Sequence, residues 1–364
     1  MRFHRLRVCD VQRETEEAVS IAFEVPEALR PRFHFVAGQF VTLRLWLDGE
    51  ELRRSYSLCS SPASRQWRIA VKRVPDGRVS TWLNTALRVG DTVEVAEPEG
   101  RFIYRPGSAR ERIMCVAAGS GITPVLSILT TALESNSQAK CFLLYGNRRV
   151  RDILFREALE DLRDRFLPRF SIVHCLSREA QEWPLQEGRI DRAKLERVFE
   201  HLVDPRSLDA LYVCGPDALA ELVSSTALSV GVAPSAIHRE RFVAPGQLRP
   251  LTPRRETRAK SGEDGAVVTV PGAWVRLTCD GWTRAFFWKR DGTTLLDAGL
   301  AQGFDLPYSC KAGVCATCRA RVLAGRVRME ENFALEAHEI AQGFVLACQA
   351  HPESDTLHVS FDVR

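Results

Sequence analysis

The sequence predicts a multidomain protein in which an antiparallel β-barrel is followed by an α/β domain with a parallel sheet and by a small α+β domain. Three observations lead to this prediction. The first hundred residues alternate short apolar segments with turn signals, the middle of the chain alternates apolar strands with amphipathic helices, and four cysteines near the C-terminus have a spacing typical of metal ligands. A chain of 364 residues is long enough for two or three such units, each with its own core.

The composition is that of a globular protein, with 45% hydrophobic and 26% charged residues. The 50 Lys and Arg residues nearly balance the 46 Asp and Glu residues, so we expect neither a nucleic acid nor a membrane surface as partner. Apolar runs such as Ile113 to Ala118 are too short to span a bilayer. The segment Met1 to Glu17 has no apolar stretch typical of a secretory signal, and the default expectation is a cytoplasmic protein.

Residues 1–106 have the pattern of a small antiparallel barrel. Short segments rich in apolar and β-branched residues are separated by turn signals, which is typical of strands joined by hairpins. We expect strands at Val19 to Val25, Gln39 to Trp46, Trp67 to Val74 and Thr92 to Val95.

Residues 107–243 change to apolar strands that alternate with helical segments, which is the pattern of βαβ units in a parallel sheet. Apolar residues recur at helical spacing between Ile153 and Phe166, and Asp191 begins another helical segment. The expected strands are Ile113 to Ala117, Cys141 to Tyr145, Phe170 to Cys175 and Ala210 to Cys214.

A linker is predicted at 244–264, because this stretch is rich in Pro, Gly and Arg and has no apolar periodicity. It contains a basic run. We interpret the run as a solvated tether, and a docking site for an acidic partner is the alternative. The basic residues are Arg254, Arg255, Arg258 and Lys260.

Four cysteines have the spacing of ligands to a plant-type [2Fe-2S] cluster. Cys310, Cys315 and Cys318 form a Cys-x4-Cys-x2-Cys loop, and Cys348 follows after 29 intervening residues. Each iron needs two thiolates, and Gly313 gives the loop the freedom to wrap around a cluster. A zinc site is the alternative, but zinc knuckles usually combine Cys-x2-Cys pairs or His partners, and one such pair is present.

The residues around this loop predict a β-grasp ferredoxin domain over 265–364. Val267 to Val270 and Val275 to Cys279 have the pattern of a hairpin, and Thr294 to Gln302 has the pattern of a helix. Val359 to Val363 has the pattern of a closing strand.

The segment Arg54-Ser55-Tyr56-Ser57 at the end of a barrel strand resembles the Arg-x-Tyr-Ser motif of the ferredoxin-NADP reductase superfamily. The resemblance implies that Arg54 meets the flavin pyrophosphate, that Tyr56 stacks on the isoalloxazine ring, and that Ser57 hydrogen-bonds near the flavin N5. An ordinary polar edge strand is the alternative.

The turn Gly77-Arg78-Val79-Ser80-Thr81 leads into a predicted helix, Trp82 to Leu87. A glycine turn before a helix N-terminus, with Ser80 and Thr81 hydroxyls at the cap, is suited to bind phosphate. In the superfamily this segment holds the flavin phosphates, and analogy favours FAD over FMN. Val71 and Lys72 of the preceding strand complete the predicted flavin-binding set.

The segment Ala117 to Pro124 follows a strand and opens a helix, with Pro124 expected at the first helical position. It differs from the Rossmann fingerprint because Pro124 replaces the last glycine, and it is similar to the nucleotide loop of the superfamily. The resemblance implies coenzyme contacts from Gly119, Gly121 and Thr123.

Cys214, Gly215 and Pro216 resemble the segment beside the nicotinamide ring, with Cys214 near the path of the hydride. A buried structural thiol is the alternative for Cys214. Glu240-Arg241-Phe242 resembles the segment whose aromatic residue approaches the flavin.

The coenzyme predicted is NADPH, because its 2′-phosphate requires positive groups. Ser177 and Arg178 follow the third strand of the α/β domain, where plant-type reductases place a Ser-Arg pair, and Arg148 follows the second strand. Glu179 is an acidic neighbour that argues against this prediction.

The whole chain resembles the reductase subunits of phenylacetyl-CoA epoxygenase systems, most closely at Gly49 to Arg54, Tyr145 to Arg148, Gly188 to Asp191 and Gly313 to Cys318. The resemblance implies an enzyme that passes a hydride from NADPH to FAD and single electrons through the cluster to a di-iron oxygenase. Ser57 and Cys214 are the predicted catalytic residues. A reductase for a Rieske, hydroxylase or desaturase system and a non-catalytic redox sensor are the alternatives.

Overall fold

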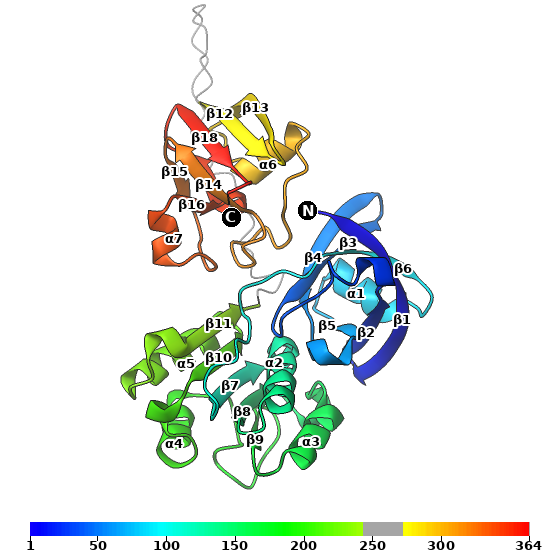
Figure 1. The fold of residues 1–364 in the computed structure, drawn as a ribbon, viewed down its shortest axis with the longest axis vertical. Helices are drawn as coiled ribbons and strands as arrows, with labels where there is room; N and C mark the ends of the chain where they lie inside the picture. The colour runs from blue at the N-terminus through cyan, green and yellow to red at the C-terminus, as the bar shows by residue number, and fades with distance from the viewer. Residues whose placement is uncertain (243–271, 364) are drawn as a thin grey trace, which may run out of the picture. The chain divides into compact units, whose positions relative to one another are not determined.

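The computed structural model describes residues 1–242 and 272–363 (Figure 1). The predicted linker 244–264, its basic run and the predicted strand Val267 to Val270 lie outside the described residues. The chain divides into two compact units, Arg2–Pro245 and Gly246–Arg364. In the described ranges, no helix combines the length and the apolar character that crossing a membrane requires.

The first unit begins with the predicted antiparallel barrel, a six-stranded sheet in the order β4-β3-β6-β1-β2-β5. The sheet curls until its two ends meet, because Leu58 after β4 forms a bridge with Ile69 in β5. Apolar residues of alternate positions fill the interior, as the period of two in a strand requires. The strands are β1 (Phe3–Thr15), β2 (Ala18–Glu24), β3 (Phe40–Leu47), β4 (Glu50–Ser57), β5 (Trp67–Lys72) and β6 (Thr92–Ala96).

Helix α1 (Arg78–Thr85) packs on the barrel and begins four residues before the predicted start at Trp82 (Figure 1). Gly77 is the N-cap, so Ser80 and Thr81 lie inside the first turn instead of at the cap. The predicted start was wrong because Val79 was assigned to the turn, whereas it is buried on the same face of the helix as Leu83, one turn later.

The second part of the same unit is the predicted parallel sheet, in the order β11-β10-β7-β8-β9. The strands after β7 first follow on one side of it, as β8 and β9, and then on the other side, as β10 and β11. The position between β7 and β10 is therefore the switch point of the sheet. Ligands of such sheets bind there, at the carboxyl ends of the strands. The strands are β7 (Arg112–Ala118), β8 (Lys140–Asn147), β9 (Phe170–Leu176), β10 (Ala210–Gly215) and β11 (Ile237–Arg241).

Two pairs of helices cover the two faces of this sheet (Figure 1). Alternate residues of β7 divide between two cores, with Cys115 facing α2 and α3 and Met114 facing α4 and α5. Barrel residues such as Ala18 and Ala70 belong to the first of these cores, which joins the barrel to the sheet. The helices are α2 (Ile122–Ser135), α3 (Arg156–Arg165), α4 (Arg192–His201) and α5 (Asp217–Ser229).

The second unit is the predicted α+β domain, a mixed sheet in the order β13-β12-β18-β14-β16 with a separate β15-β17 pair. Its core combines apolar residues of the large sheet with those of α6 and includes the cysteines Cys318 and Cys348. The elements are β12 (Gly272–Cys279), β13 (Trp282–Lys289), α6 (Leu295–Ala301), β14 (Arg319–Ala324), β15 (Val327–Met329), α7 (Ala337–Ala341), β16 (Phe344–Leu346), β17 (Ala350–Pro352) and β18 (Thr356–Ser360).

The hairpin of this domain differs from the prediction, because β12 pairs with the following strand β13. Asp280 and Gly281 both have positive φ angles, 51° and 77°, which is the requirement of the tight turn that Asp-Gly favours. The closing strand β18 also begins three residues before the predicted Val359.

Candidate functional site

The four predicted cluster ligands lie close together as two pairs of thiols. Side-chain hydrogen bonds join Cys310 to Cys315 and Cys318 to Cys348. The first three follow α6 in a loop, and Cys348 lies in the short 3-10 helix Ala347–Gln349. Two thiols for each of two irons is the donor set that a [2Fe-2S] cluster needs, so these residues fit such a cluster.

The loop reaches this arrangement through three residues with left-handed backbone conformation, Lys311, Gly313 and Ala316, at φ 52°, 74° and 55°. The curl directs backbone amides toward sulfur, and the amide of Ala312 donates to the Cys310 sulfur at 3.3 Å. Hydrogen bonds from Cys315 and from backbone amides lower the pKa of Cys310 to about 6. The same hydrogen bond raises the pKa of Cys315 well above its ordinary value, so the pair favours one thiolate, which is the form that binds metal, at Cys310.

Arg54, Tyr56 and Ser57 lie at the end of β4. Tyr56 is opposite Val41 in β3 and packs partly against the barrel core. Because successive strand residues face opposite sides, Ser57 faces away from this core, and only 4% of it is exposed. The Arg54 guanidinium donates to the carbonyl oxygen of Arg53 at 2.7 Å.

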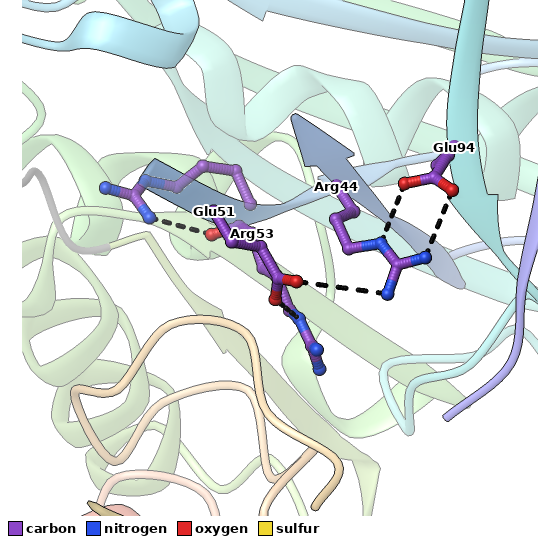
Figure 2. A network of polar contacts seen from close by, with 5 residues as sticks. Arg44, Glu51, Arg53 and Glu94 are labelled. Carbon is purple, nitrogen blue, oxygen red and sulfur yellow. Dashed lines mark hydrogen bonds and ion pairs between the residues drawn. The ribbon is translucent and has the colours of Figure 1, made fainter. Parts of the chain in front are cut away.

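Figure 2 shows the charged network beside this motif. Arg44 in β3 donates two hydrogen bonds to Glu94 in β6, at 2.8 and 3.1 Å. Arg44 also lies 3.9 Å from Glu51 in β4, and Glu51 accepts from the Nε of Arg53 at 2.7 Å. Bidentate pairing fixes geometry as well as charge, so the network fixes β4 to its neighbours just before Arg54.

The predicted phosphate-binding turn covers the N-cap and the first turn of α1. The Ser80 hydroxyl accepts from the amide of Val74 at 3.2 Å and donates to the carbonyl of Gly77 at 3.0 Å. A Cβ atom at Gly77 would lie 2.4 Å from the Ser80 oxygen. The tight turn therefore requires glycine, and it leaves the first amides of α1 and the exposed Thr81 available to an anion.

Val71 and Lys72 end β5 beside this turn. The Val71 side chain is buried in the barrel core. The backbone carbonyl of Val71 accepts a hydrogen bond from the side-chain amide of Asn84 at 3.0 Å. The Lys72 ammonium lies 4.0 Å from a carboxylate oxygen of Glu17.

Gly119 and Gly121 form a 3-10 turn between β7 and α2. A Cβ atom at Gly121 would lie only 2.2 Å from the carbonyl oxygen of Cys214. At Gly119 the φ angle is +53° and a Cβ atom would meet nothing within 4 Å. The Tyr145 hydroxyl donates to the Gly119 carbonyl at 2.9 Å. The glycine loop thus packs against the end of β10 at the switch point of the sheet.

The start of α2 corrects the prediction for Pro124. Gly121 is the N-cap of the helix, so Pro124 is the third helical residue instead of the first. The helix begins at Ile122, two residues before Pro124 and directly after the 3-10 turn Gly119–Gly121. Thr123 is buried, and its hydroxyl donates to the carbonyl of Ser120 at 3.0 Å.

Cys214, Gly215 and Pro216 lie on the other side of the switch point, at the end of β10. The Cys214 thiol is fully buried, and burial raises its pKa well above the ordinary value. The amide of Phe242 donates to the Gly215 carbonyl at 3.3 Å, which places the backbone of Phe242 beside Gly215.

Glu240 joins the two predicted catalytic residues, and the sequence did not indicate this role. The pairing of β10 with β11 places Cys214 opposite Glu240, and the Cys214 sulfur lies 4.0 Å from a Glu240 carboxyl oxygen. The Glu240 carboxyl group also hydrogen-bonds Ser57 of the barrel. Burial raises the Glu240 pKa from 4.5 to about 8, although part of the residue stays exposed.

Glu240→Gln is expected to flatten the pH dependence of stability. The pKa of Glu240 in the folded chain is about 8, above the ordinary value of 4.5. Between these two pH values the folded chain keeps a proton on Glu240 that the unfolded chain has released. The free energy of unfolding therefore falls as the pH rises through about 8. Thermal unfolding of both proteins from pH 5 to 9 should show the variant gaining relative Tm as the pH rises. Glu196→Gln, on the exposed side of α4, is the control. Parallel curves for Glu240→Gln and the unsubstituted chain would contradict this assignment.

The residues predicted to bind the 2′-phosphate of NADPH lie together at the carboxyl ends of β8 and β9. The amide of Ser177 donates to the Asn147 carbonyl at 2.9 Å, and the amide of Arg178 donates to the Arg148 carbonyl at 2.8 Å. Within the described ranges, the exposed guanidinium groups of Arg148 and Arg178 form no ion pair. The Glu179 carboxylate accepts from the amide of Val150 at 2.9 Å.

Three family models match the chain in the order of its domains. The family described as "Oxidoreductase FAD-binding domain" matches residues 5–104, and "Oxidoreductase NAD-binding domain" matches residues 115–225. The family described as "2Fe-2S iron-sulfur cluster binding domain" matches residues 277–353.

Curated relatives span the whole chain. One subunit of the 1,2-phenylacetyl-CoA epoxidase of Escherichia coli K12 is 40% identical over 363 residues, which cover 100% of this chain and 98% of the relative. The chain belongs to the ferredoxin reductase superfamily, among the reductase components of oxygenases. The reductase is also 35% identical to the "3-ketosteroid-9-alpha-monooxygenase, ferredoxin reductase component" of Rhodococcus rhodochrous, over 98% of this chain and 96% of the relative.

A solved structure has the same fold. Phthalate dioxygenase reductase superposes with a TM-score of 0.61 at 24% identity and covers 99% of this chain and 98% of its own. The predicted fold class and cofactor classes are thereby confirmed: the reductase has an FAD-binding barrel, an NAD-binding parallel-sheet domain and a 2Fe-2S domain.

Proposed function

We propose that this reductase takes a hydride from NADPH and delivers single electrons to a di-iron oxygenase, the phenylacetyl-CoA epoxygenase. The observation that carries the proposal is the 40% identity to the 1,2-phenylacetyl-CoA epoxidase component of Escherichia coli over the full length of both chains. We also propose that residues 1–106 bind FAD, 107–243 bind the coenzyme, 244–264 connect, and 265–364 bind the cluster.

A bound flavin can accept two electrons as a hydride and release them one at a time. The chain contributes position and electrostatics. Arg54 and the first turn of α1 offer a guanidinium and backbone amides to the flavin phosphates, and Tyr56 offers an aromatic face. Ser57 and Glu240 form a hydrogen-bonded pair at the meeting point of the two domains, beside Cys214. This pair can hold a proton where the hydride is transferred.

The preference for NADPH over NADH rests on the edge formed by β8 and β9. Arg148 and Arg178 are neighbours there, and their guanidinium groups are exposed. Glu179 argued against NADPH at the level of sequence, but its carboxylate caps the 3-10 turn that starts at Val150. An acid held by a backbone amide is directed away from the role of binding a ribose hydroxyl, which supports NADPH.

Arg178→Ala is expected to lower kcat/KM for NADPH by about ten- to a hundredfold, the effect of removing one charged hydrogen bond to phosphate. The value for NADH should change little, because NADH carries no 2′-phosphate. Steady-state kinetics with both coenzymes checks this, with Arg197→Ala on the exposed side of α4 as control. An equal loss with NADH, or a higher kcat/KM for NADH in the unsubstituted chain, would contradict the proposal.

The partner is tested by reconstitution with the purified di-iron component of phenylacetyl-CoA epoxygenase. NADPH oxidation and epoxide formation are followed together. We expect NADPH oxidation and epoxide formation to be tightly coupled. NADPH oxidation without epoxide, combined with rapid reduction of an artificial acceptor, would contradict the partner and leave the electron-transfer chemistry in place.

A reductase for a different oxygenase is the second candidate. It is favoured by the 35% identity to the 3-ketosteroid-9-alpha-monooxygenase reductase component over nearly the same length. Faster turnover with that oxygenase than with the di-iron component would decide for this candidate.

A further inference from the structure

A glutamine side chain connects the last predicted cluster ligand to the loop that carries the other three. Gln349 follows Cys348 in the 3-10 helix Ala347–Gln349, and only 7% of it is exposed. Its Nε2 amide donates to the carbonyl of Lys311 at 3.2 Å and to the Cys348 sulfur at 3.7 Å. Both hydrogens of this amide therefore point at the cluster-binding region.

The position of Gln349 is fixed on several sides. The backbone carbonyl of Gln349 accepts a hydrogen bond from the backbone amide of Glu330 at 2.9 Å. This bond connects Gln349 to the segment after β15. A Cβ atom at Gly313 would lie 3.2 Å from the Gln349 Cγ, so the side chain packs closely on the cysteine loop. Lys311, whose carbonyl it holds, has the unfavourable left-handed backbone conformation. The amide is thus preorganised and does not need to reorient when a cluster is bound.

We infer that Gln349 is a positioning residue that raises the reduction potential of the cluster through its hydrogen bond to Cys348. Reduction adds one electron to the cluster, and no bond forms or breaks. The added negative charge spreads onto the sulfur ligands, so an N–H donor at a sulfur stabilises the reduced state more than the oxidised state. The inference rests on the proposed binding of a [2Fe-2S] cluster by the four cysteines.

The test compares Gln349→Met with Gln342→Met in the full-length holoprotein. Methionine matches the length of glutamine and removes both N–H donors, while Gln342 is an exposed residue of the same domain. The midpoint potential is measured by a redox titration followed by electron paramagnetic resonance. We expect Gln349→Met to reduce the equilibrium constant for one-electron reduction about tenfold, the effect of losing one hydrogen bond to a charged group. That change corresponds to ~59 mV in the negative direction for a one-electron couple.

Gln349→Glu is the second variant, because it keeps the shape and replaces the donor by an acceptor. It should shift the potential further in the negative direction than Gln349→Met. If both variants keep the potential of Gln342→Met, the inference is overturned.

A measurement on the unsubstituted chain covers the case in which a variant loses its cluster. Glutamine labelled with heavy nitrogen at the side-chain amide should show a hyperfine coupling to the reduced cluster, and its absence would overturn the inference. The iron and sulfide content of the unsubstituted protein distinguishes a failure of the proposed function from a failure of the role of Gln349. A chain without a [2Fe-2S] cluster contradicts the proposed function, whereas a cluster with an unshifted potential in the variants contradicts only the role of Gln349.

Discussion

Replacing Cys315 by alanine is expected to abolish single-electron delivery while leaving the flavin active. The cluster needs four thiolates, and Cys315 shares a side-chain hydrogen bond with Cys310 in one of the two pairs. Reduction of a one-electron protein acceptor such as cytochrome c should fall by roughly a hundredfold or more, since the site for the cluster is incomplete. Reduction of ferricyanide by NADPH should continue, because this small acceptor takes electrons from a flavin directly.

Cys279→Ala is the matched control for this substitution. Cys279 belongs to the same domain, is partly buried and lies at the end of β12, outside the four predicted ligands. Its variant should keep both activities and the iron content. Retention of cytochrome c reduction by Cys315→Ala, with the iron content unchanged, would contradict the assignment of this ligand.

Gly121→Ala is expected to lower kcat/KM for the coenzyme by about a hundredfold, because displacements of about 1 Å in a site for hydride transfer have effects of this size. A Cβ atom at this position would lie 2.2 Å from the carbonyl oxygen of Cys214. Two backbone segments meet there, so no side chain can rotate away. The glycine loop must separate from the end of β10, and the two sides of the switch point lose their relative position.

The size of the loss in Gly121→Ala is judged against Gly231→Ala. Gly231 has a φ angle of +96° and a Cβ atom there would meet nothing within 4 Å. Its variant carries backbone strain of about 1 kcal/mol without any clash. Kinetics and thermal unfolding of both variants check the prediction. Similar coenzyme kinetics in the two variants would show that the contact between Gly121 and Cys214 has no functional weight.

The sequence predicted the parts of the site that depend on local spacing. Cys310, Cys315 and Cys318 lie within nine residues, so their pattern already contains the geometry of the loop. The apolar runs of β7 and β10 likewise indicated a buried parallel sheet, and their ends marked the nucleotide loop and Cys214.

The contacts that the sequence did not predict arise between distant segments. Strand β11 reads Ile-His-Arg-Glu-Arg and has no apolar pattern, so its pairing with β10 and the meeting of Glu240 with Ser57 were not visible. The capping of Val150 by Glu179 depends in the same way on the adjacency of two strand ends. Asp280-Gly281 is, by contrast, a local turn signal in the sequence for the β12–β13 hairpin.

Electron transfer from NADPH through the flavin to the cluster can be followed in a single anaerobic titration with NADPH. Visible absorption follows the flavin, and electron paramagnetic resonance follows the cluster in the same sample. We expect the flavin absorption to bleach and the signal of a reduced [2Fe-2S] cluster to appear as NADPH is added. Bleaching of the flavin without any cluster signal, although iron and sulfide are present, would contradict the transfer of electrons from flavin to cluster.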